Sequence, residues 1–90
     1  MGTAAVKIKI MPNSPDSNLK EIEEKVRISI EKDSGKVISF TQEPIAFGLK
    51  AVYVFFEWPE EKELDQLEEK LNRIEEVKSA EVSDIRRAIG

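Results

Sequence analysis

The chain has 90 residues, a formal net charge of -4, and neither cysteine nor histidine. Its length predicts a single domain over residues 1–90, small but able to fold alone. The composition excludes disulfides and thiolate chemistry and removes the commonest general base and metal ligand, and the acidic balance disfavours a general nucleic-acid binder, which would show a basic face.

The first predicted element is a strand at residues 5–10, with the sequence AVKIKI. The strict alternation of apolar residues with Lys7 and Lys9 is typical of a strand with one buried face. The two lysines also interrupt the apolar segment that a signal peptide would need, and no apolar run approaches the ~20 residues that span a bilayer. We therefore expect a cytoplasmic protein that does not enter a membrane.

A helix is predicted after the turn-forming segment MPNSPDSN, with Asn18 as its N-cap. Glu21, three residues later, fits the acidic arm of a capping box. Gly35 is expected to end the helix because glycine tolerates the left-handed conformation of a C-cap. The apolar face of this helix comprises Leu19, Ile22, Val26 and Ile30.

Two strands are predicted next, at residues 36–42 and 49–58, and the segment EPIAFG separates them. The second strand is apolar on both faces, which is typical of a strand in the middle of a sheet. Pro59 follows it and ends it, because a strand interior cannot use a residue without an N–H.

A second helix is predicted at residues 60–76, with eight acidic and three basic residues and thus a net charge of -5. We expect these charges to form a solvated face. A last strand begins at Val77, and its tail carries Arg86 and Arg87. The apolar face of the second helix comprises Leu64, Leu67, Leu71 and Ile74.

The predicted order of elements, strand–helix–strand–strand–helix–strand, is that of the α+β ferredoxin-like fold. It implies a four-stranded antiparallel sheet with both helices on one face and with the first and third strands in the middle. The other face of the sheet is then open to water or to a partner. Such folds host many functions, so the function has to be argued from particular residues.

Enzyme chemistry is disfavoured because no histidine is present to activate the serines. An RNA-recognition motif would place a basic residue before Gly48, but Tyr53 and Phe55 are left as candidates for stacking on bases. A regulatory or docking module that binds a small metabolite at a sheet edge or a dimer interface is the second alternative. No cofactor and no metal are expected.

Two other features favour a protein partner. Ile45 either covers the core as a lid or faces solvent, whereas Gly48 permits a tight turn that presents Phe47 outward, and such aromatic rings are frequent binding anchors. Arg86 and Arg87 form a positive spot suited to a carboxylate or a phosphate. The candidate partner-binding residues are Pro44, Ile45, Phe47, Gly48, Arg86 and Arg87.

Three segments resemble the translation elongation factor 1-beta family. EPIAFGLKAVYV resembles its Pro-Ile/Val-Gly/Ala-aromatic-Gly-Ile/Leu-Lys segment, VKSAEVSDIRR resembles its closing strand, and VKIKIMPNSPDSNLKEIEEKV resembles its opening. The resemblance covers nearly the whole chain. The length also matches the archaeal form of the family, which consists of the guanine-nucleotide exchange domain alone.

The resemblance implies an exchange factor that promotes GDP release from the GTPase elongation factor 1-alpha during protein synthesis, without bond chemistry of its own. It implies that Phe47 occupies the position of the loop aromatic that contacts the GTPase. In the eukaryotic relatives, a lysine just before the C-terminus reaches toward the magnesium and phosphate-binding region of the GTPase. Alignment from Val77 places Arg87 at that position, with Arg86 as the neighbouring alternative. We expect a free monomer that makes no direct contact with nucleic acid.

Overall fold

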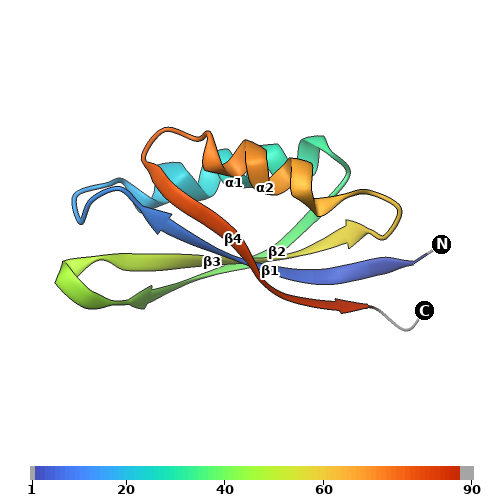
Figure 1. Ribbon diagram of the computed structural model, residues 1–90, viewed down its shortest axis with the longest axis horizontal. Coiled ribbons are helices and arrows are strands. Elements are labelled where there is room, and N and C mark those ends of the chain that lie inside the picture. The colour runs from blue at the N-terminus through green and yellow to red at the C-terminus, as the bar shows by residue number, and fades with distance from the viewer. Residues whose placement is uncertain (1, 88–90) are drawn as a thin grey trace.

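The computed structural model describes residues 2–87, which form one four-stranded sheet with two helices on one of its faces (Figure 1). Neighbouring strands are all antiparallel, in the order β2-β3-β1-β4. This confirms the α+β ferredoxin-like fold, with the first and third strands in the middle. The elements are β1 (Thr3–Pro12), α1 (Leu19–Lys32), β2 (Lys36–Pro44), the 3-10 turn η1 (Ala46–Gly48), β3 (Lys50–Pro59), α2 (Leu64–Asn72) and β4 (Val77–Arg87).

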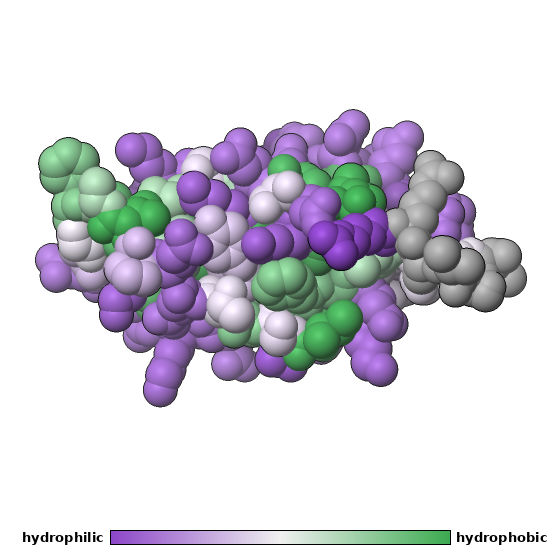
Figure 2. Space-filling view, turned by 90° about the horizontal axis from the view of Figure 1, so that it is seen from below, coloured by the Kyte–Doolittle hydropathy of each residue, from purple (hydrophilic) through white to green (hydrophobic). Residues whose placement is uncertain are grey.

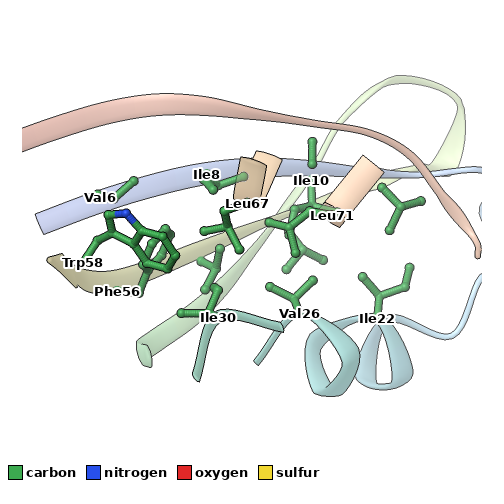
Figure 3. Packing of buried hydrophobic residues seen from close by; sticks show 14 of the residues in the cluster. Val6, Ile8, Ile10, Ile22, Val26, Ile30, Phe56, Trp58, Leu67 and Leu71 are labelled. Atoms are coloured by element: carbon green, nitrogen blue, oxygen red, sulfur yellow. The ribbon is translucent and has the colours of Figure 1, made fainter. Parts of the chain in front are cut away.

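The core lies between the sheet and the helices, and the side chains drawn in Figure 3 from β1, β3, α1 and α2 point toward one another. Every second residue of the central strands faces this layer, so the alternation in the sequence becomes one buried face. Phe56 and Trp58 meet edge to face, with their ring centroids 5.9 Å apart. The buried side chains include Val6, Ile8, Ile10, Ile22, Val26, Ile30, Val52, Val54, Phe56, Trp58, Leu67 and Leu71.

The start of α1 is the predicted one. Asn18 Oδ1 accepts a hydrogen bond of 3.2 Å from the backbone N–H of Glu21, so the N-cap is confirmed. The Glu21 carboxylate lies 3.3 Å from Lys25 Nζ, one turn further on. Of the predicted apolar face, Ile22, Val26 and Ile30 are buried in the core, and Leu19 is half-buried against it.

The end of α1 is where the sequence places it, but the reason given for Gly35 is wrong. The left-handed residue is Ser34, with φ of 74°, and Gly35 does not have a positive φ. A Cβ at Gly35 would lie 2.6 Å from Ile30 Cγ2 and 2.9 Å from Trp58 Cε3. Gly35 is therefore required by close packing between the helix end and the core, not by the cap conformation.

The helix α2 is shorter than residues 60–76, the range that the sequence predicts, because it covers only Leu64–Asn72. Before the helix, the carbonyl of Lys62 accepts a hydrogen bond of 3.1 Å from the Trp58 indole N–H, and the chain forms a turn there. After the helix, Glu76 adopts φ of 75° and reverses the chain into β4. Contacts with the core thus shorten the helix at its start, and a left-handed residue follows its end.

The edge strand β4 is joined to α2 by three hydrogen bonds from side chains to the backbone. The Asn72 amide donates to the Ala80 carbonyl at 2.9 Å and accepts from the Ala80 N–H at 2.9 Å. The Glu68 carboxylate accepts from the Val82 N–H at 2.8 Å. These bonds fix the first half of β4 against the helix.

Replacing Asn72 with alanine should lower the free energy of unfolding by about 1–2 kcal/mol, because the buried backbone groups of Ala80 lose both partners. Urea unfolding followed by circular dichroism measures this loss. The control is Arg73→Ala, which removes only an exposed ion pair to Glu69 and should cost no more than about 0.5 kcal/mol. Equal losses in the two variants would contradict the role given to Asn72.

The helices α1 and α2 are also joined at their surface. Asp33, the C-cap residue of α1, accepts a hydrogen bond of 2.8 Å from Lys70 Nζ. Lys62 Nζ donates a second hydrogen bond, of 2.7 Å, to the backbone carbonyl of Asp33. The hydrogen bond from Lys70, with the nearby lysine charges, lowers the pKa of Asp33 below its ordinary value. This contact lies on the helix side of the sheet.

Candidate functional site

The loop between β2 and β3 is a closed and compact turn. The Ile45 N–H donates to the Leu49 carbonyl at 2.8 Å, and the Leu49 N–H donates to the Ala46 carbonyl at 3.3 Å. Phe47 and Gly48 both have positive φ, of 64° and 75°. Two consecutive left-handed residues reverse the chain within a few residues, and glycine accepts this conformation without strain. Gly48 thus has the tight-turn role that the sequence predicts.

Phe47 stands at the tip of this loop with 91% of its surface exposed. The left-handed conformation is uncommon for a residue with a bulky side chain. The loop therefore exposes a large apolar ring to water, and it does so at a residue whose backbone conformation is unfavourable for a bulky side chain. This arrangement does not stabilise the folded protein, and backbone strain of this kind tends to cluster at functional positions.

The neighbours of the loop define one end of the molecule. A Cβ added to Gly48 would lie 3.8 Å from Pro15 Cβ, so the tip lies beside the connection from β1 to α1. Figure 1 shows both connections at the end of the molecule opposite the chain termini. Ile45 is half-buried and does not belong to the core cluster, while Pro44 is exposed at the end of β2. The interpretation of Ile45 as a lid on the core is not supported.

The end of β4 defines the opposite end of the molecule. Arg86 pairs with Ala5 in the sheet, its side chain is 83% exposed, and its Nε lies 3.2 Å from an Asp84 carboxylate oxygen. Arg87 is the last described residue, and its backbone pairs with Ala4. The side chain of Arg87 lies outside the described part of the chain.

The two groups of predicted site residues do not come together. β3 and β4 both run antiparallel to β1, so the start of β3, at the loop tip, and the end of β4 lie at opposite ends of the sheet (Figure 1). The molecule is elongated, with extents of 42 × 20 × 18 Å. A single pocket of a partner cannot contact both Phe47 and Arg86, but an elongated contact can.

The chemistry available at these two ends is that of binding. The loop tip presents apolar side chains, and the end of β4 presents a guanidinium group, which suits carboxylates and phosphates. Among residues 2–87, no group of three or more acidic side chains is placed to hold a metal ion. In the same part of the chain, no helix is long and apolar enough to cross a membrane.

The aromatic residues considered for RNA binding are half-buried on the face of the sheet opposite the helices. Lys7 Nζ lies 4.6 Å from the ring centre of Tyr53 and 5.3 Å from that of Phe55. This cation lies over the ring faces on which a base would have to stack. The arrangement therefore disfavours the RNA-binding alternative. This contact was not predicted from the sequence, although the alternation of the two strands places Lys7 and Phe55 on one face.

A comparison with known families matches residues 5–88 to the EF-1 guanine nucleotide exchange domain. Among curated relatives, Elongation factor 1-beta of Methanococcus maripaludis strain S2 is 41% identical over 87 residues, covering 94% of this chain and 97% of the relative. The proteins of the same name from Methanocaldococcus jannaschii and Pyrococcus furiosus are 38% and 42% identical, covering 94% and 89% of this chain and 97% and 89% of their own lengths.

Among solved structures, the ACT domain from GTP pyrophosphokinase of Chlorobium tepidum aligns with a TM-score of 0.62. The alignment covers 88% of this chain and 96% of that domain, but the two sequences are only 16% identical. This similarity supports the ferredoxin-like fold and says nothing about function.

Proposed function

The chain belongs to the EF-1 guanine nucleotide exchange domain family, and on that basis we propose that it promotes the release of GDP from elongation factor 1-alpha during protein synthesis. The observation that carries this proposal is the loop between β2 and β3, which holds Phe47 91% exposed at one end of the molecule. The protein acts as one exchange domain, in the cytoplasm and as a free monomer, without a cofactor.

The physical logic of exchange is a linkage between two binding events. A GTPase holds GDP through backbone amides, a lysine and a magnesium ion. A partner that binds the nucleotide-free state more tightly weakens nucleotide binding by the same factor. Release is therefore accelerated although the partner makes and breaks no bond.

The two ends of this molecule have different parts in the proposal. The apolar loop tip, formed by Pro44, Ile45, Phe47 and Gly48, anchors the domain on the GTPase. At the other end of the sheet, the cation of Arg87, with Arg86 as its neighbour, competes for the position of magnesium and the phosphates. The extent of 42 Å supports a contact that reaches two separate places on the GTPase.

The direct test is the release of fluorescent GDP from the cognate elongation factor 1-alpha, with this protein in substoichiometric amount. Acceleration with multiple turnovers is the expected result. A GTPase that is active but releases GDP at its intrinsic rate in the presence of this protein would refute the proposal.

The double variant Arg86→Ala with Arg87→Ala should lower the maximal rate of GDP release by about tenfold, because one charge-assisted interaction contributes about 1.5–3 kcal/mol. The concentration needed for half-maximal exchange should change by less than about threefold, because anchoring is assigned to the other end. The two single variants, measured in the same way, show which arginine matters. A double variant with the wild-type maximal rate would contradict the role of both cations.

A further inference from the structure

The face of the sheet opposite the helices carries a shallow hollow of about 360 Å³. In Figure 2 hydrophobic surface lies here between hydrophilic side chains. All four strands contribute to the hollow, and Arg86, near the end of β4, is one of its lining residues. Its lining includes Ala5, Lys7, Ile38, Phe55, Asp84 and Arg86.

Ile38 enters this hollow because the strand β2 is irregular. The register of β2 against β3 shifts between Val37 and Ser39, so Ile38 has no partner in the ladder. A bulge of this kind redirects a side chain, and here an isoleucine beside Phe55 is left 58% exposed. An isolated exposed isoleucine is ordinary, but this one lines the hollow together with the half-buried ring of Phe55. We call Lys7, Ile38, Tyr53 and Phe55 the open-face patch.

The size of a stable interface requires surface beyond the two ends. Specific complexes bury about 800 Å² on each partner, from roughly 20–30 residues. The loop tip and the arginines are far fewer residues than that, and they lie at opposite ends of a molecule 42 Å long. A partner that touches both ends must therefore also cover one of the faces between them.

The composition of the two faces decides which one is covered. The centres of protein interfaces are depleted of charge and enriched in aromatic residues and arginine. The helix side carries the acidic segment 60–76, with its net charge of -5. The opposite side carries the open-face patch, bordered by Arg86.

We propose that the open-face patch is the surface on which the GTPase lies between the two end contacts, a proposal that rests on the exchange function proposed above. The sheet of this domain faces the GTPase, and the helices face solvent. The patch contributes affinity, whereas the arginines act on nucleotide release. Ile38 supplies the exposed apolar side chain, and Lys7, which lies over the rings of Tyr53 and Phe55, supplies charge for acidic groups of the GTPase.

The test compares two isoleucines with matched exposure on opposite faces. Ile38 is 58% exposed on the sheet side, and Ile28, in α1, is 57% exposed. In the GDP-release assay, Ile38→Asp should raise the concentration for half-maximal exchange by about tenfold or more, because a charge in a desolvated interface is strongly unfavourable. The maximal rate should stay within about twofold of wild type. Ile28→Asp should change neither quantity.

Thr41→Glu is a second variant on the sheet side, exposed and paired with Tyr53, and it should act like Ile38→Asp. Thermal unfolding shows that each variant is folded at the temperature of the assay. The proposal is overturned if Ile38→Asp and Thr41→Glu exchange like wild type, or if Ile28→Asp impairs exchange equally. The proposal is also overturned, in favour of RNA on this face, if the protein binds RNA in a salt-dependent way and Ile38→Asp abolishes that binding but leaves exchange unchanged. A wild-type protein that does not accelerate GDP release refutes the exchange function itself.

Discussion

Replacing Phe47 with alanine should raise the concentration needed for half-maximal exchange by about 30-fold or more, because a buried aromatic anchor contributes at least about 2 kcal/mol to binding. The free energy of unfolding should change by less than about 0.5 kcal/mol, because a ring that is 91% exposed contributes almost nothing to the core. The separation of the two effects is the signature of a residue kept for binding. The GDP-release assay and urea unfolding measure them independently.

Two further variants at this position serve as controls. Phe47→Leu keeps an apolar side chain and should retain part of the affinity. Phe47→Gly removes the side chain and also relieves the backbone at φ of 64°, so it should be at least as stable as wild type and exchange as poorly as Phe47→Ala. A loss of stability of several kcal/mol in Phe47→Ala would instead mean that the ring packs against the domain.

The largest effect on stability is expected at Gly35. Gly35→Ala should lower the free energy of unfolding by about 2–3 kcal/mol, since overpacking a filled core forces its neighbours to move. The added Cβ would meet Ile30 and Trp58 at distances of 2.6 and 2.9 Å, and both are buried and cannot yield easily. For a domain of this size the melting temperature should then fall by roughly 10–20 °C.

The neighbouring residue provides the matched control for this explanation. Ser34→Gly places glycine where φ is 74°, and it should be neutral or stabilise the protein by up to about 1 kcal/mol. At these two adjacent positions, the expected changes in the free energy of unfolding thus have opposite signs. If Gly35→Ala were tolerated, the close packing at the end of α1 could not be the reason for the glycine.

Local sequence patterns predicted much of this fold because they reflect local physics. The alternation in residues 5–10 and the cap at Asn18 depend on neighbours in the chain, and both predictions are confirmed. The start of α2 and the role of Gly35 both depend on Trp58. Its indole N–H bonds the Lys62 carbonyl before α2, and its ring packs against Gly35, which is distant in sequence. The bulge that exposes Ile38 likewise arises from pairing with β3 and has no signature within β2.

The candidate site was predictable in its parts but not in its extent. The apolar residues around Phe47 and the arginine pair were visible as exceptions in an acidic and otherwise ordinary chain. Their positions at opposite ends also follow from the predicted strand order, because β3 and β4 are both antiparallel to β1. The surface between them could not be found in the same way. Its residues join only through the register of neighbouring strands and the bulge in β2.

The hydrogen bonds from α2 to β4 also limit how chains can aggregate. An open edge strand is a template for a strand of another molecule. At β4 the backbone groups of Ala80 and Val82 are already bonded to Asn72 and Glu68, so an incoming strand meets a helix instead. Strand addition is then blocked at the first half of β4. Two chains joined through β2 would then offer a third chain only the second half of β4, so growth beyond a pair is disfavoured.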